Sequence, residues 1–196
     1  MAVSSDPAAL VLELARARPP TLGVGRLICV DGPAGSGKTS LAAAVADRAH
    51  APVIHMDDLY DGWTGLETVG GQVEGVLRPL AEGRPGEYRR YDWHAGAYAE
   101  TVTVDPAPLL VVEGVGSGDR AHADLCTALV WVSAPDDLRL ARGLARDGAA
   151  VEDHWRTWMD TEREHFARER TRDRADVLVD GSGPGTSQVQ DRGFGR

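Results

Sequence analysis

The chain has 196 residues, of which 42% are hydrophobic and 26% charged, as is typical of a single globular domain. Its net charge of −9 disfavours binding to nucleic-acid phosphates, and its apolar runs are too short to cross a bilayer. The first 20 residues lack the pattern of a secretory leader, and Cys29 and Cys126 are expected to be reduced thiols. We therefore expect a cytoplasmic protein with no nucleic-acid or membrane partner, and a homo-oligomer stays an open alternative.

Apolar runs and helical patterns alternate along the chain. The apolar runs predict buried strands at 26–32, 52–58, 108–115, 128–134 and 175–181. Helices are predicted at 6–18, 38–50, 72–82, 135–147 and 151–172, while 62–71 is expected to be irregular and 87–105 to form a loop followed by a short strand. Alternating strands and helices indicate an α/β fold of three α/β/α layers, with a mostly parallel five-stranded sheet and a short helical lid.

Residues 32–39 read GPAGSGKT and match the phosphate-loop pattern G-x-x-x-x-G-K-[ST] between a predicted strand and a predicted helix. Glycines let such a loop wrap a phosphate closely, and its N–H groups and the helix dipole attract negative charge. Lys38 is the one lysine among 21 cationic residues, so composition alone would have placed arginine there. We infer that a compact ammonium is required at this position.

The motif therefore predicts that ATP is a cofactor and that Mg²⁺ accompanies it beside the Thr39 hydroxyl. The residues expected to contact the nucleotide are Gly32, Pro33, Ala34, Gly35, Ser36, Gly37, Lys38, Thr39 and Ser40.

Carboxylates follow two of the predicted strands. Asp57 and Asp58 lie at the end of the second strand and Glu113 at the end of the third. The ends of parallel strands share one edge of the sheet, so these side chains should lie near the phosphate loop, where they could hold Mg²⁺ or accept a proton from an attacking hydroxyl. The sequence leaves open whether Asp57 or Asp58 is the base.

Several segments together resemble the uridine kinase-like family of P-loop kinases, which neighbours phosphoribulokinase and pantothenate kinase. The resemblance covers roughly residues 22–181 and is carried, in order, by GPAGSGKT, MDDLY, RYDW, ETVTVDPAPLLVVEG, LRLARGLARD and RADVLVDG. It implies a P-loop kinase domain over 21–181, preceded by an N-terminal helix over 1–20. We expect a disordered tail over 182–196, because this segment has few residues that could pack.

The resemblance also implies roles for individual residues. Asp57 matches the aspartate that acts as general base on the acceptor hydroxyl near Mg²⁺, and Glu113 matches a glutamate of the metal shell. Thr39 matches the metal-binding hydroxyl of the loop. Tyr91 matches a tyrosine that lies against the acceptor. The lid arginines that neutralise charge during transfer would be Arg142 and Arg146.

The chain departs from uridine kinases on the acceptor side. It has DGWTGLETVGG where they carry an Asp-His-Pro element, and Gly96 where they carry a histidine, the nearest one here being His94. The lid segment DGAAVEDHW is also shorter. Phosphate handling is thus retained without the nucleoside-reading residues. The residues expected to line the acceptor site are Asp57, Tyr60, Trp63, Tyr91, Trp93 and His94.

Other residues receive structural interpretations. We interpret His55 as a packed histidine, and Trp155 and Trp158 as part of the core. The mixed charges over 162–174, which include Glu162, predict a solvated helix face.

The sequence thus predicts a kinase that phosphorylates a hydroxyl of a small molecule, a nucleoside being one candidate. A nucleoside monophosphate kinase is the first alternative, since it would use arginines such as Arg78, Arg84, Arg89 and Arg90. A nucleotide-binding switch or ATPase is the second.

Overall fold

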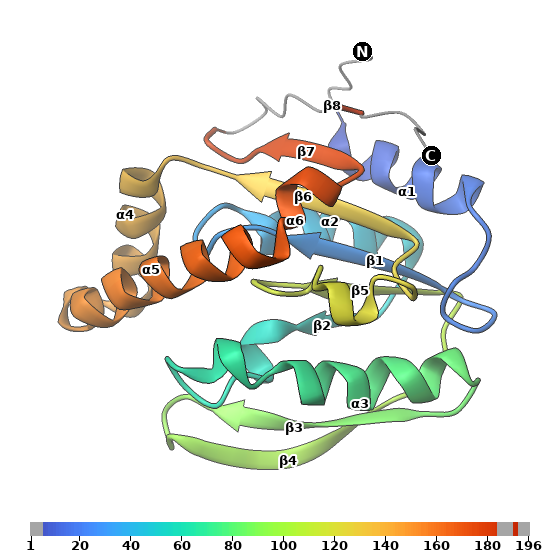
Figure 1. Ribbon diagram of the computed structural model, residues 1–196, viewed down its shortest axis with the longest axis horizontal. Coiled ribbons are helices and arrows are strands. Elements are labelled where there is room, and N and C mark those ends of the chain that lie inside the picture. The colour runs from blue at the N-terminus through green and yellow to red at the C-terminus, as the bar shows by residue number, and fades with distance from the viewer. Residues whose placement is uncertain (1–5, 184–189, 192–196) are drawn as a thin grey trace.

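The computed structural model describes residues 6–183 and 190–191, and its main sheet has the strand order β2-β5-β1-β6-β7-β8 (Figure 1). The first five strands pair in parallel, which confirms the predicted five-stranded parallel core. Their bounds are Arg26–Asp31 for β1, Val53–His55 for β2, Leu109–Glu113 for β5, Ala128–Ser133 for β6 and Val177–Asp180 for β7.

Alternation along the central strands divides the core between the two faces of the sheet. Ile28 and Val30 of β1 pack with α1 (Pro7–Ala17) and α2 (Lys38–Ala49) on one face. Leu27 and Cys29 point to the other face and pack with α3 (Gly70–Ala81) and α5 (Glu152–Glu169). Successive residues of a strand point to opposite faces of the sheet, and in the buried strands both sets are apolar. Both faces must therefore be covered by helices.

The shorter elements complete the layers. Helix α4 spans Asp136–Asp147, and single 3₁₀ turns lie at Met56–Asp58, Gly65–Glu67, Arg120–His122 and Ala149–Val151. The predicted helix over 151–172 is divided, because Arg170 adopts a left-handed conformation (φ 52°) between α5 and α6 (Thr171–Arg174). No helix within the described residues is long and apolar enough to span a bilayer.

The segment predicted as a loop with a short strand is a β-hairpin. Strand β3 (Gly86–Asp92) pairs antiparallel with β4 (Ala97–Val104), and together they form a separate two-stranded sheet beside α3. The loop prediction was wrong over 87–92 and 97–99, which are strands, because Arg and Tyr alternate irregularly there; it holds for the turn at 93–96. A register shift between Arg89 and Tyr91 also breaks the period-2 pattern that marks a strand.

The predicted tail over 182–196 lies mostly outside the described residues. Within it, Gln190–Asp191 form β8, a two-residue strand that pairs antiparallel with β7. Without β8, β7 would be an edge strand of the sheet with unpaired backbone groups, and β8 pairs with that edge.

Helix α4 approaches α5 closely at Gly143. A Cβ atom built at Gly143 would lie 2.3 Å from the Trp155 ring, so Gly143→Ala should destabilise the protein by roughly 1–3 kcal/mol through overpacking. Denaturant unfolding measures this change. The matched control is Gly71→Ala in α3, where a Cβ meets nothing within 4 Å and helix propensity should add up to about 1 kcal/mol of stability. Equal effects of the two substitutions would contradict the packing argument.

Candidate active site

The phosphate loop lies at the carboxyl ends of the parallel strands, on the side of the molecule where α4 and α5 lie (Figure 1). It leaves β1 at Asp31 and enters α2 at Lys38, through Gly37 in a left-handed conformation (φ 101°). Gly32 also has positive φ (140°), and a Cβ there would lie 2.0 Å from the Val132 carbonyl oxygen. Only glycine fits this approach to β6, which fixes where the loop begins.

Three consecutive carbonyl oxygens of the loop accept hydrogen bonds from cationic side chains. Lys38 Nζ donates to Pro33 O at 2.9 Å. Arg139 Nη1 donates to Ala34 O at 3.0 Å, and Arg142 Nη1 donates to Gly35 O at 3.1 Å. The carbonyls, which would repel an anion, are therefore bound by the surrounding protein.

The N–H groups of the loop have the opposite character. Within the described residues, the backbone N–H groups of Gly35, Gly37, Lys38 and Thr39 have no acceptor, and the buried hydroxyl of Ser36 has no partner either. Unpaired N–H groups at a helix N-terminus, with Lys38 beside them, form a site suited to phosphate oxygens. The residues present thus fit the phosphate groups of a nucleotide.

Glu113 joins the loop to β2. Its Oε1 accepts a hydrogen bond from Thr39 Oγ1 at 3.0 Å and lies 2.6 Å from His55 Nδ1. The bond to Glu113 raises the pKa of His55, which is half-exposed and faces the site, so its interpretation as a packed histidine was wrong.

A metal ion bound here would take its ligands from more than the protein. Thr39 and Glu113 offer the oxygen ligands that Mg²⁺ prefers. Among the described residues, no group of three or more His, Cys, Asp and Glu side chains could hold a metal ion by itself. This suits Mg²⁺, which commonly keeps waters and substrate phosphates in its shell.

Asp57 lies within the electrostatic field of both carboxylates and cations. Asp57 is an exposed residue, and the protein around its carboxyl group desolvates that group. This desolvation raises the pKa of Asp57, and Glu113 raises it further, while Lys38 and Arg146 oppose the change. The Asp57 carboxyl is therefore within range of the charges of the loop lysine and of Glu113.

The two lid arginines differ in their contacts. Arg142 is bonded to the loop through Gly35 O. Arg146 forms an ion pair with Asp147 at 2.7 Å and lies over the Trp155 ring, with its charge acting on both Asp57 and Glu113. Both arginines thus belong to the region around the loop.

An aromatic cluster lies beside Asp57. Trp93 Nε1 donates to Asp57 O at 2.8 Å, and the Trp93 ring contacts Tyr91 and Trp63 edge to face. Trp63 in turn stacks on His154 at the start of α5, with ring centroids 5.4 Å apart. The cluster connects the hairpin, the segment after β2 and the lid, and it brings three of the predicted acceptor residues together.

Two other predicted acceptor residues lie elsewhere. Tyr60 is buried in the core, its hydroxyl donates to Val115 O at 2.6 Å, and its ring packs on Trp158. We therefore withdraw Tyr60 from the acceptor site. His94 lies in the hairpin turn with an exposed side chain, and its backbone N–H donates a hydrogen bond to Asp92 Oδ1.

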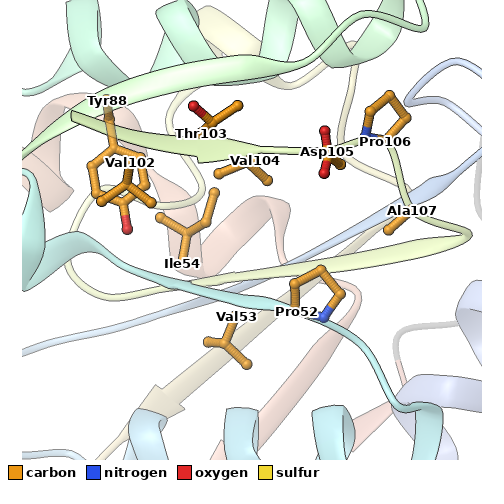
Figure 2. A pocket seen from close by; sticks show the side chains of 10 residues that line it. All are labelled: Pro52, Val53, Ile54, Tyr88, Val102, Thr103, Val104, Asp105, Pro106 and Ala107. Carbon is orange, nitrogen blue, oxygen red and sulfur yellow. The ribbon is translucent and has the colours of Figure 1, made fainter.

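A cavity of about 350 Å³ lies between β2 and β4, away from the phosphate loop (Figure 2). Tyr88, Val102 and Val104 of the hairpin face Ile54 of β2 across it, and Pro52, Asp105 and Pro106 line its far end. Its lining includes none of the phosphate-loop residues, so it is distinct from the nucleotide site.

The family assignment comes from a comparison with protein-family models. Residues 70–180, more than half of the chain, match the model of the Phosphoribulokinase / Uridine kinase family. This chain belongs to the phosphoribulokinase/uridine kinase family. The protein is accordingly a P-loop kinase, and the predicted resemblance is confirmed. Its activity is the transfer of a phosphoryl group.

Solved structures with the same architecture accompany this assignment. A Bacillus stearothermophilus protein, described provisionally as a uridine kinase, shares 20% identity with a TM-score of 0.59, over 86% of this chain and 96% of that chain. A protein from Silicibacter sp. TM1040, described provisionally as a fructose transport system kinase, shares 18% identity with a TM-score of 0.62. The match covers 89% of this chain and 96% of that chain. A comparison with curated proteins found no match. At these identities the structures show the common fold alone.

Sequence reasoning missed several residues of this kinase that contact the phosphate loop. Arg139 and Glu162 form a buried ion pair against Ala34, although Glu162 was predicted to lie on a solvated face. Asp31 is fully buried, and its carboxyl accepts the N–H groups of Gly32 and Gly118 at 2.7 and 2.9 Å. For Asp31, the signal available in the sequence was its place directly before Gly32, the first glycine of the loop.

The Asp31 carboxyl should make stability depend on pH. Burial raises its pKa to about 7, with the Asp119 charge adding and the N–H bonds opposing. Because the folded protein holds this proton more tightly than the unfolded chain, the contribution is present in acid and is lost as pH rises from about 4 to 7.

We therefore expect the stability of the wild type relative to Asp31→Asn to fall by roughly 2–3 kcal/mol between pH 5 and pH 8, measured by urea unfolding. The exposed substitution Asp137→Asn on α4 is the control and should show no such trend. A difference between wild type and Asp31→Asn that is the same at both pH values would exclude this titration.

Proposed function

We propose that this kinase transfers the γ-phosphoryl group of ATP, together with Mg²⁺, to a hydroxyl group of a small molecule that carries no phosphate. The observation that carries the proposal is that Glu113, at the end of β5, is bonded to Thr39 of the phosphate loop at 3.0 Å, and that Asp57, in the turn after β2, is within range of the charges of Glu113 and Lys38. A carboxylate base, a metal-shell carboxylate and a phosphate-binding ammonium are the groups that this reaction requires.

The phosphate loop would hold the nucleotide through its free N–H groups and Lys38, and Thr39 with Glu113 would hold Mg²⁺ directly or through water. When bound, ATP-Mg supplies the transferable phosphoryl group and neutralises much of its charge. Arg142 and Arg146 would add positive charge at the lid side, where negative charge must be balanced during transfer.

Asp57 would accept the proton of the acceptor hydroxyl. Its raised pKa brings the carboxylate closer to the pH range in which a general base works best, and the charges of Lys38 and Arg146 oppose this rise. Asp58 is the neighbouring candidate, and its pKa is also raised by desolvation. Asp57 is favoured as the base because the charges of Lys38 and Arg146 act on it, whereas neither is among the charges that act on Asp58.

The charges near the hairpin favour an acceptor without a phosphate group. Three of the four arginines that a monophosphate kinase could use are paired with carboxylates: Arg78 with Asp124 and Glu74, Arg84 with Glu82, and Arg90 with Glu100. The fourth, Arg89, lies over the Tyr98 ring. The aromatic cluster of Trp63, Tyr91 and Trp93 suits an acceptor with a ring, so nucleosides belong in the candidate set.

The test is an ADP-release assay with ATP-Mg alone and then with panels of nucleosides, sugars and other alcohols, and nucleoside monophosphates. Stimulation by an alcohol or nucleoside, with the phosphorylated product detected by mass spectrometry, is the expected result. Stimulation by monophosphates alone would support the monophosphate kinase alternative. Full turnover without any acceptor would support a nucleotide switch.

A further inference from the structure

The peptide groups on both sides of Ala34 are held by side chains of α4 and α5. The Ala34 N–H donates to Glu162 Oε2 at 2.8 Å, and the Ala34 carbonyl oxygen accepts from Arg139 Nη1 at 3.0 Å. Glu162 lies on α5 and Arg139 on α4, and the same Arg139 Nη1 also donates to Glu162 Oε1. One buried ion pair thus joins α4 and α5 to a single residue of the phosphate loop.

This pair lies in a costly environment. The exposed fractions of Glu162 and Arg139 are 1% and 3%. Removing two charges from water opposes folding, and apolar residues of similar volume often stabilise such a site as well or better. Asp136 is a further partner of Arg139 at 2.8 Å, but its carboxyl is mostly exposed. A contribution to the stability of the fold therefore does not by itself explain why charged residues occupy these two positions.

The ion pair fixes the orientation of the peptide that joins Ala34 to Gly35. A trans peptide is planar, and its C=O and N–H point in opposite directions. Binding the Ala34 carbonyl to Arg139 therefore turns the Gly35 N–H away from α4, and this N–H has no acceptor within the described part of the chain. Gly35 has φ +76° and no side chain to resist a flip of this peptide. A flipped peptide would present a carbonyl oxygen to the phosphates.

We propose that Glu162 and Arg139 are positioning residues that fix the peptides on either side of Ala34 and thereby set the nucleotide affinity of the phosphate loop. This proposal rests on the proposed binding of ATP. Glu162 fixes the peptide before Ala34 and orients Arg139, while Arg139 fixes the peptide after it. Neither side chain needs to touch the nucleotide, because both act through the loop backbone.

The experiment separates positioning from stability with the double variant Arg139→Met/Glu162→Leu, which replaces the ion pair by apolar side chains of similar size. The melting temperature should be retained or raised, whereas calorimetric titration with ADP-Mg should show affinity lower by about tenfold or more. Loss of affinity in a protein of unchanged stability is a result that a purely structural role does not give.

Two single substitutions complete the test. Glu162→Gln keeps an oxygen for the Ala34 N–H but loses the charge that orients Arg139, so it should retain more affinity than the double variant, with a loss of about threefold. Glu164→Gln removes an exposed carboxylate from the same helix and should bind ADP-Mg like the wild type.

A folded double variant with wild-type affinity would overturn the proposal. If the double variant does not fold, wild-type affinity in Glu162→Gln would overturn it. Absence of ADP-Mg binding to the wild type would instead contradict the proposed function itself.

Discussion

Replacing Lys38 by alanine should lower kcat/KM for ATP by about a thousandfold, equivalent to roughly 4 kcal/mol of transition-state stabilisation. Lys38 is 7% exposed, and its ammonium lies against Pro33 O at the mouth of α2, where its charge acts on both Asp31 and Asp57. Removing it takes away the one mobile cation of the loop at the place where the β- and γ-phosphates would lie. Steady-state kinetics together with ADP-Mg titration measure the change.

Lys38→Arg is the sharper control for this prediction. It keeps the charge and is the substitution that the composition of the chain would favour, since all 20 other cationic residues are arginine. A planar guanidinium cannot occupy the narrow space that a compact ammonium fills, so we expect at least a hundredfold loss. Activity close to the wild type in Lys38→Arg would show that only charge matters here. Activity close to the wild type in Lys38→Ala would remove the phosphate-binding role.

Substituting Asp57 by asparagine should lower kcat by about 10²- to 10⁴-fold while the dissociation constant for ADP-Mg stays within about threefold of the wild type. Asparagine has nearly the same shape but cannot accept the proton of the acceptor hydroxyl. The loss should therefore fall on transfer and spare nucleotide binding. Single-turnover kinetics with the acceptor found in the panel separate the two effects.

Asp58→Asn is the matched control, because it removes the adjacent carboxylate from the same 3₁₀ turn. We expect a loss of less than about tenfold, since the pKa of Asp58 responds mainly to desolvation, His55 and Arg90 rather than to Lys38. If Asp58→Asn abolishes transfer and Asp57→Asn does not, the base is Asp58. Full transfer in both variants would mean that this turn supplies no base.

The parallel sheet could be predicted because its strands are continuous apolar runs. Strands β1, β5 and β6 are buried along almost their whole length, so nearly every position in them is hydrophobic. The hairpin could not be predicted in the same way. Its strands are partly exposed and contain Arg, Glu and Thr, and their register is irregular at Arg89. Packing of Gly86 and Tyr88 against other elements stabilises it, and that information is not local.

Some residues of the candidate site were also placed wrongly by sequence reasoning. Tyr60 was expected to line the acceptor site, but it follows the 3₁₀ turn after β2 with its ring in the core. Glu162 was expected to face water because its neighbours in sequence are charged. It is buried because the helix face that carries it also carries Trp155, Trp158 and Met159. Local charge patterns predict exposure only when the opposing surface is known.

The sequence by itself determined the phosphate loop, the five parallel strands with the helices that connect them, and the carboxylates at the strand ends. These features depend on consecutive residues, on local periodicity and on the rule that parallel strands end at one edge. Only the tertiary structure decided that α4 and α5 hold Ala34 through Arg139 and Glu162, that Asp31 is buried beneath the loop, and that an aromatic cluster lies beside Asp57. These contacts join residues many tens of positions apart, and their formation depends on the packing of whole helices rather than on local sequence.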